Sequence, residues 1–288
     1  MRIVPSDSDL KSWCKCAPTS GDLIFLKSSI ASLSNAIEVP ILPASEIKEQ
    51  GLTGPWTLNN RSWYGYSLSQ ANLCTWRPSG KIEQLSPDLQ SELRAVQTLI
   101  GVPVIIDQEW VTSHKWSTLS SSEKIKTLRK WIITNEVHFY EGYSFDDLPL
   151  QAQFELTKIG FEDQLNRFAP FSGPNCFATV ASALNGNTDR ETALKWMHWP
   201  ELEQHLTKNL FERSDSNTPQ SGDVLIFSKE NNPVHAAIYL GENFYFEKPG
   251  QDFYEPYRVA KLSDWQDEWE DHSLCIWKKF DSAKCPVS

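Results

Sequence analysis

The chain has 288 residues, with 40% hydrophobic residues and 12 tryptophans, which suffices for a sizeable core and for two domains. Its formal net charge of −10 argues against a nucleic-acid-binding protein, for which a basic face is expected. No apolar run approaches the roughly 18–20 residues that a membrane span needs, and residues 1–8 hold no apolar core of an export signal.

The use of cysteine favours a reducing, cytoplasmic location. Cys14 and Cys16 are too close in sequence for an ordinary disulfide bridge, and the other cysteines are scattered. There is no Cys-x-x-Cys motif and no zinc-type spacing of cysteine and histidine. We therefore expect neither a metal site nor a cofactor.

Residues 1–145 are expected to form an N-terminal α+β domain. The stretch Gly21–Phe25 is typical of a buried strand, and residues 51–80, rich in glycine, asparagine, serine and tryptophan, are typical of short strands with turns. Exposed tryptophan rings in this stretch could stack on a sugar. Buried rings would only fill the core, which is the more frequent role of large aromatic side chains.

Two helices are predicted later in this half. Ser86–Ile100 is predicted to be a helix that ends at Gly101, and residues 102–106 a short strand. Ser120 and Glu123 have the spacing of a capping box and precede an apolar stripe with helical period. No catalytic motif is visible in this half, so we expect it to shape the cleft and select the substrate.

Residues 146–288 are expected to form the second domain. Asp146–Phe168 is predicted to be an amphipathic helix that leads into a cysteine-bearing segment, and Thr188–Arg213 to hold two further helices. Ser263–Asp271 carries five acidic residues and is predicted to be a short helix with a solvated face. Ser273–Phe280 is predicted to be the last strand.

A cysteine at the start of a predicted helix is the first candidate for chemistry. Apolar residues recur with helical spacing from Phe177 to Leu184, after Pro174 and Asn175, which suit a helix start. Cys176 therefore lies in the first turn and off the apolar stripe. There the helix dipole and the free backbone N–H groups favour a thiolate and could stabilise an oxyanion. A lone cysteine is a weak signal, since it also packs as a small hydrophobe.

A histidine at the start of a strand is the second candidate. Val224–Phe227 is predicted to be a buried strand, His235–Leu240 a second one, and Phe244–Glu247 the return strand of a hairpin. A histidine in this position can act as the base of a cysteine nucleophile, or it can be a satisfied histidine at a strand end. His198 and His205 are rivals for the role of base, ranked lower because neither precedes a strand of the required kind.

The loop of this hairpin decides which residue faces His235. With a three-residue loop at residues 241–243, His235 and Glu247 are diagonal neighbours on one face of the sheet. With a two-residue loop, Lys248 lies on that face instead. A carboxylate at Glu247 could orient the imidazole and stabilise its charged form, although a solvated strand residue is the simpler role for a lone glutamate.

The cysteine at a helix start, the Gly222-Asp-Val-Leu-Ile-Phe strand and the His-x-x-Ile-Tyr-Leu-Gly segment that ends at Gly241 resemble the NlpC-type cell-wall peptidases of the papain-like superfamily. The resemblance covers roughly residues 170–280. That family usually has aspartate before the cysteine, where this chain has Asn175. The family also commonly has a second histidine at the orienting position, where this chain offers Glu247.

The resemblance implies an α+β fold with a papain-like core, in which the cysteine-bearing helix packs on an antiparallel sheet. It implies that Cys176 is the nucleophile, His235 the base and Glu247 the orienting residue. The expected activity is hydrolysis of a peptide or isopeptide amide bond through a thioester, on peptides or peptidoglycan fragments. The alternatives are an acyltransferase of the same superfamily and an inactive protein that binds glycan or peptide.

Overall fold

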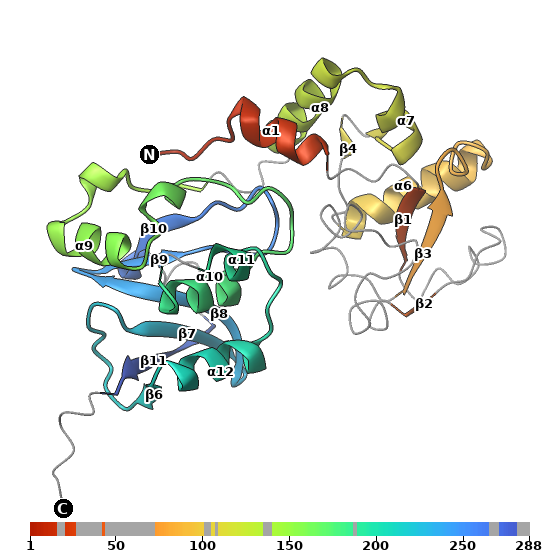
Figure 1. The fold of residues 1–288 in the computed structure, drawn as a ribbon. Coiled ribbons are helices and arrows are strands. Elements are labelled where there is room, and N and C mark those ends of the chain that lie inside the picture. Colours follow the sequence, from red (N-terminus) through yellow and green to blue (C-terminus); the bar gives the residue numbers. More distant parts are fainter. Residues whose placement is uncertain are drawn as a thin grey trace, which may run out of the picture. The chain divides into compact units, whose positions relative to one another are not determined.

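Figure 1 shows the fold of the chain as a computed structural model. The residues that it describes are 1–15, 21–26, 42–43, 73–100, 105–106, 109–134, 140–186, 189–264 and 271–280. The chain divides into two compact units. The C-terminal unit comprises Met1–Val4, Phe139–Ala169 and Gly173–Ser288, and the N-terminal unit comprises Pro5–His138 and Pro170–Ser172. A domain boundary between residues 145 and 146 stays a prediction.

The C-terminal unit is built on a six-stranded antiparallel sheet with the strand order β10-β9-β8-β7-β11-β6. Its strands are β6 (Phe211–Ser214), β7 (Val224–Lys229), β8 (Asn232–Gly241), β9 (Phe244–Glu247), β10 (Arg258–Lys261) and β11 (Ser273–Lys279). The predicted strands that correspond to β7, β8, β9 and β11 are confirmed. Strand β8 begins earlier than expected, because the turn before it is formed by Glu230 and Asn231, both with positive φ.

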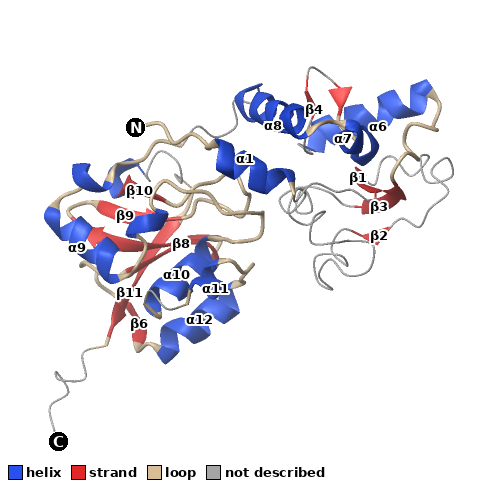
Figure 2. Cartoon of the chain, turned by 45° about the horizontal axis from the view of Figure 1, so that its top comes forward, coloured by secondary structure: helices blue, strands red, loops and turns tan. Residues whose placement is uncertain are grey.

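Helices cover this sheet (Figure 2). They are α9 (Leu150–Lys158), α10 (Cys176–Leu184), α11 (Arg190–Ala193) and α12 (Trp199–Lys208). The two helices expected between residues 188 and 213 are confirmed. A single helix over residues 146–168 is wrong: α9 ends where Gly160 takes a left-handed conformation with φ +75°, and a short 3₁₀ turn at Glu162–Gln164 follows.

The two faces of the sheet bury different sets of side chains. Helices α9 and α10 pack on β8 and share one apolar core with Ala236, Ile238 and Phe246 of the sheet. The opposite face buries a second cluster that includes Phe227 and Tyr245. Because side chains alternate along a strand, these clusters show which face each neighbouring residue occupies.

The N-terminal unit contains a small antiparallel sheet in the order β1-β3-β2. Helix α6 packs on β1, and the buried side chain of Gln97 holds Phe25 of that strand by accepting from its N–H at 2.9 Å and donating to its C=O at 2.7 Å. The described elements of this unit are α1 (Asp7–Cys14), β1 (Gly21–Leu26), β2 (Leu42–Pro43), β3 (Leu73–Pro78), α6 (Pro87–Ile100), β4 (Ile105–Ile106), β5 (Glu109–Trp110), α7 (Ser113–Thr118) and α8 (Ser121–Thr134).

Several predictions for this half are confirmed. They include the strand from Gly21 and the helix that ends at Ile100. The capping box before α8 is also formed: Ser120 N–H donates to Glu123 Oε2 at 2.7 Å, and Glu123 N–H donates to Ser120 Oγ at 3.3 Å. Most of the tryptophan-rich stretch, residues 51–72, lies outside the described residues.

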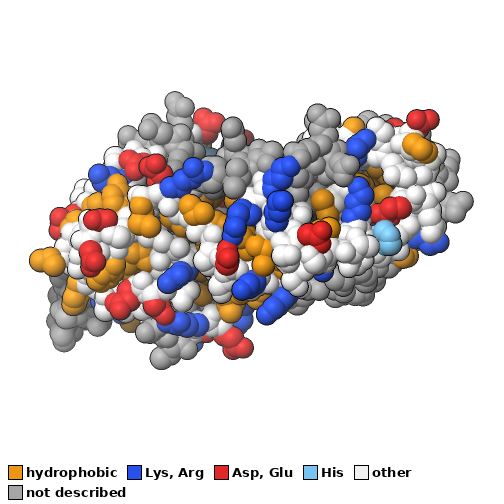
Figure 3. All heavy atoms as spheres, turned by 90° about the horizontal axis from the view of Figure 1, so that it is seen from above, with side chains coloured by type: hydrophobic (Ala, Val, Ile, Leu, Met, Phe, Trp, Pro, Cys, Tyr) orange, Lys and Arg blue, Asp and Glu red, His pale blue; other side chains and the backbone are white. Residues whose placement is uncertain are grey.

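Within the described part of the chain, no helix combines the length and the apolar character that crossing a membrane requires. One face of the molecule carries acidic, basic and apolar side chains interspersed (Figure 3).

Candidate active site

Cys176 is the first residue of helix α10, as the sequence predicts, and its side chain is largely buried. Asn175 caps the helix by accepting from Ala178 N–H at 3.1 Å. Its amide nitrogen donates to Met197 C=O at 2.7 Å, so the capping side chain is held from both ends. The N–H groups of Cys176 and Phe177 have no acceptor within the helix, because the first turn of any α-helix lacks preceding carbonyls. They are available to a negatively charged oxygen atom beside the thiol.

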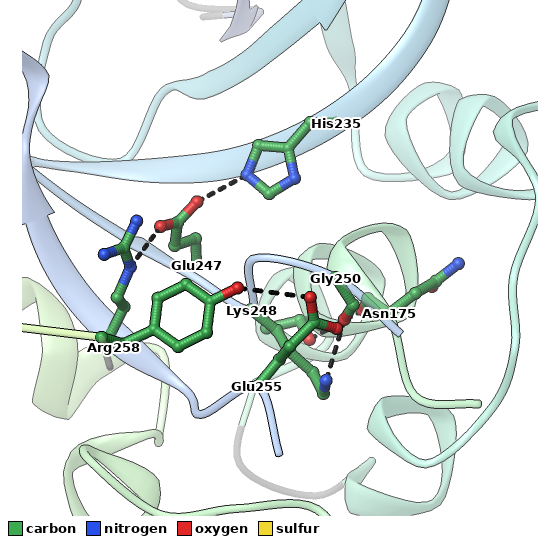
Figure 4. A network of polar contacts seen from close by, with 9 residues as sticks. Asn175, His235, Glu247, Lys248, Gly250, Glu255 and Arg258 are labelled. Atoms are coloured by element: carbon green, nitrogen blue, oxygen red, sulfur yellow. Dashed lines mark hydrogen bonds and ion pairs between the residues drawn. The ribbon is translucent and has the colours of Figure 1, made fainter. Parts of the chain in front are cut away.

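His235 lies near the start of β8 and is 1% exposed. Its Nε2 lies 2.7 Å from Oε2 of Glu247, which is also 1% exposed and ends strand β9 (Figure 4). The ring packs against Phe227 with 5.4 Å between centroids. Because Glu247 engages Nε2, the other ring nitrogen, Nδ1, is the one left for a different partner.

That different partner is Cys176. Burial alone would lower the pKa of His235, but the charge of the Cys176 thiolate, its hydrogen bond to the imidazole, and then Glu247 raise the pKa to about 10. The raised pKa favours an imidazolium ring between two anions. An imidazolium beside a thiolate is the ion pair that activates cysteine nucleophiles.

Glu247 is held in its charged form by a second cation. Arg258 Nε, from the adjacent strand β10, donates to Glu247 Oε1 at 2.6 Å (Figure 4). Burial alone would raise the pKa of Glu247, but Arg258 and then His235 lower it below the usual value. The carboxylate therefore has one oxygen on each cation, which fixes its orientation toward the histidine.

The hairpin register agrees with the three-residue-loop prediction. Glu242 and Asn243 form the turn, with φ values of 50° and 70°, and Gly241 pairs with Phe244. A bulge between Tyr239 and Gly241 then shifts the pairing, so that Ile238 faces Phe246. Continued by one pair, this register puts Glu247 opposite Ala237 and diagonal to His235. The turn itself has two residues, and the bulge gives the strands the same pairing that a three-residue loop would give.

The rival histidines lie on another element. His198 precedes α12 and its ring lies 6.1 Å from that of Trp196, while His205 is inside α12. The structure brings Cys176, His235 and Glu247 together and leaves His198 at the start of α12 and His205 within it.

Reasoning from the sequence missed Arg258 and Tyr140, and it named Lys248 only as the residue that a different register would place beside His235. Arg258 stands in the apolar run Tyr257-Arg-Val-Ala260, and a charge within such a run was an available sign of a buried partner. Tyr140 lies beneath the guanidinium, with its ring centroid 4.9 Å from Arg258 Cζ. Nothing in the sequence near Tyr140 indicates this contact, because it joins segments more than a hundred residues apart.

No group of three or more histidine, cysteine, aspartate or glutamate side chains suited to a metal ion occurs among the described residues. The cysteines that the structure describes, Cys14, Cys74, Cys176 and Cys275, are free thiols.

Comparison with known proteins returned no significant match among curated proteins and none among solved structures. One family model matches, and the match begins at Cys176 and extends beyond His235, Glu247 and Arg258. Residues 176–273 match the model of the NlpC/P60 family, which confirms the resemblance for this part of the chain. The antiparallel sheet and the helix that begins at Cys176 are consistent with the papain-like fold of that family.

Proposed function

We propose that the C-terminal unit is a cysteine hydrolase that cleaves an amide bond through a thioester, with Cys176 as nucleophile, His235 as general acid and base, and Glu247 as the orienting residue. The observation that carries this proposal is the buried imidazole of His235, which interacts with Glu247 through one nitrogen and with Cys176 on the other side. The NlpC/P60 match over the same residues supports it.

In the first half of the reaction, the Cys176 thiolate attacks the carbonyl carbon of the substrate and forms a tetrahedral oxyanion. The N–H groups of Cys176 and Phe177 stabilise this oxyanion. The side-chain amide of Asn175 does not take this role, because it donates to Met197 C=O. When the C–N bond breaks, His235 donates its proton to the leaving nitrogen. The products of this step are a free amine and a thioester on Cys176.

In the second half, neutral His235 takes a proton from water, and the resulting hydroxide attacks the thioester carbon. The C–S bond breaks, which releases a carboxylic acid and restores the thiolate beside the imidazolium. Glu247 stabilises the imidazolium in both halves without taking its proton, as the low pKa of Glu247 requires.

The proposed substrates are peptides, with peptidoglycan-derived stem peptides as the first class to test. A cytoplasmic location, which the cysteine usage favours, would make recycled cell-wall fragments their source. The N-terminal unit is proposed to contribute to substrate selection.

The first test is the rate of alkylation of Cys176 against pH, resolved by mass spectrometry of the labelled peptides. We expect alkylation to continue well below pH 8 and to lose this acid-side reactivity in His235→Ala. Cys275 is a control inside the same molecule, because burial raises the pKa of its thiol and should confine its alkylation to alkaline solution. A Cys176 that reacts only when the protein unfolds would contradict the proposal.

The second test is turnover of stem peptides, with Cys176→Ala as the inactive reference. We expect release of a new amine and a new carboxylate in the wild type and neither in the variant. Turnover that requires an added amine or lipid acceptor would identify a transferase. Tight binding that Cys176→Ala retains, with no turnover in the wild type, would identify a binding protein.

A further inference from the structure

We propose that Lys248 is a positioning residue for the nucleophile, and that its ammonium group holds the 248–255 loop against the segment that leads into Cys176. The inference rests on the proposed function, because it assigns Lys248 a role in the reactivity of Cys176. It concerns a buried charge that the reaction described above does not use.

Lys248 follows Glu247 directly, and its side chain is fully buried. Tyr245 belongs to the cluster on one face of the sheet and Phe246 to the core shared with α10 on the other. By alternation, Glu247 lies on the face of Tyr245, and Lys248 on the face of Phe246 and α10. Strand β9 ends at Glu247, and the same alternation carried one residue further puts Lys248 on the face of Phe246, which bears the nucleophile helix.

The ammonium group of Lys248 ties the loop to the end of the strand. Its Nζ donates to the carbonyl oxygens of Gly250 at 2.8 Å and Asp252 at 3.0 Å. The loop is closed further by Glu255, whose Oε2 accepts from Asp252 N–H at 2.6 Å. Burying an ammonium group destabilises the folded state unless the group is hydrogen-bonded. These carbonyls and the lysine therefore hold one another in place.

The same loop contacts the chain just before the nucleophile. Gly173 N–H donates to Gln251 C=O at 2.7 Å, and Gln251 lies between the two residues whose carbonyls bind Lys248. Only Pro174 and Asn175 separate Gly173 from Cys176. Lys248 is thus connected to the nucleophile by its hydrogen bonds to the loop, by the loop's hydrogen bond to Gly173, and by a short stretch of backbone. Asn175 in that stretch is itself held as the helix cap.

The charges around Lys248 come from both the loop and α10. Burial lowers the pKa of Lys248, and the negative charges of Glu255, Asp252 and Cys176 oppose this effect. Glu255 also accepts from Tyr140 at 3.3 Å, and the ring of Tyr140 lies against Arg258, the partner of Glu247. One network of charges therefore reaches both the base and the nucleophile, and Lys248 is the cation that it holds in the 248–255 loop.

The test is Lys248→Met, which keeps the length and apolar stem of the side chain and removes the charge. We expect the acid edge of the Cys176 alkylation profile to move to higher pH, because a buried positive charge that interacts with Cys176 is lost. On a substrate that the wild type turns over, we expect kcat to fall roughly tenfold to a hundredfold, with little change in KM. A role confined to folding would lower the amount of active protein and leave the pH profile unchanged.

Gly250→Ala is the second variant and tests the loop without removing the charge. A Cβ at Gly250 would collide with the carboxylate of Glu255, which closes the loop. We expect the same fall in kcat with a smaller movement of the pH profile. Lys158→Met is the matched control: Lys158 is a half-exposed lysine paired with Glu155 on α9, and we expect its loss to leave both readouts unchanged.

The outcomes separate this inference from the proposed function. If wild-type Cys176 lacks acid-side reactivity, the proposed function fails and the inference with it. If the wild type shows that reactivity and both Lys248→Met and Gly250→Ala retain its pH profile and kcat, the role of Lys248 is contradicted and the proposed function stands. If Lys248→Met does not fold, the Gly250→Ala result decides by the same criterion.

Discussion

Each unit buries a carboxylate on a strand, and the two carboxylates behave in opposite ways. Glu247 lies between Arg258 and His235, and its pKa is lowered. Asp22 of the N-terminal unit accepts from the N–H and the hydroxyl of Ser113, both at 2.7 Å, and its pKa is raised to about 6 because burial outweighs these bonds. Burial is nearly equal at the two positions. The charge of the partners therefore decides the direction.

The two carboxylates also have opposite effects on stability as the pH changes. Glu247 has a folded pKa below its unfolded value, so its contribution is present above the unfolded pKa and is lost as the pH falls through the folded one. The folded pKa of Asp22 is raised, so the folded state holds its proton more tightly, and stability falls as the pH rises from about 4 to about 6. Glu247 belongs to the candidate site, whereas Asp22 anchors the start of α7 to β1.

The largest effect is expected from removing Arg258, the cationic partner that Glu247 has and Asp22 lacks. Arg258→Met leaves the carboxylate buried with one charged partner fewer, and we expect a loss of about 3–5 kcal/mol in the free energy of unfolding. Urea unfolding of the full chain measures this loss. Arg190→Met is the control, because Arg190 pairs with Asp163 on the surface, and a pair of that kind contributes at most about 1 kcal/mol. Equal losses in the two variants would contradict the comparison.

A smaller effect is expected when Glu247 itself loses its charge. Glu247→Gln keeps the shape and removes the anion that raises the pKa of His235. The histidine should then lose its proton at lower pH, so the alkaline limit of activity moves downward. We expect kcat to fall roughly a hundredfold or more. The measurement is the pH–rate profile of both proteins, and an unmoved alkaline limit would show that Glu247 does not act on His235.

The smallest effect concerns Asp22. In the wild type its titration should lower the free energy of unfolding by about 2 kcal/mol between pH 4 and pH 6, given the raised pKa. Asp22→Asn should remove that part of the slope. Other groups titrate in this range, so the quantity to compare is the difference between the two proteins at each pH, measured by urea unfolding. A constant difference across the range would mean that the pKa of Asp22 is not raised.

The parts of the site that the sequence predicts are those set by local patterns. The start of α10 follows from Asn175 as a capping residue and from the apolar spacing after Cys176. The position of Glu247 follows from alternation along the hairpin. Its predicted register is the observed one, although the turn has two residues and a bulge where a three-residue loop was predicted. Both patterns extend over a few residues and depend little on the rest of the fold.

The parts that it does not predict depend on distant segments. Arg258 reaches Glu247 because β10 pairs with β9, and Tyr140 reaches Arg258 across more than a hundred residues of chain. Lys248 entered the prediction only as the residue that a different register would place beside His235. Its interaction with Gly250 and Asp252 depends on how the loop folds back, which no periodicity encodes.

The turn at Glu242 and Asn243 is exposed, and exposed loop tips are where proteins usually tolerate insertions and deletions. This tip is an exception in one respect. With the bulge between Tyr239 and Gly241 unchanged, adding or removing a single residue there would exchange the faces of Glu247 and Lys248. The ammonium would then meet the histidine, and the carboxylate would meet the nucleophile helix. Changes of two residues would preserve the arrangement. As long as that bulge is kept, this hairpin is expected to accept many substitutions at its tip and to vary in length only by even steps.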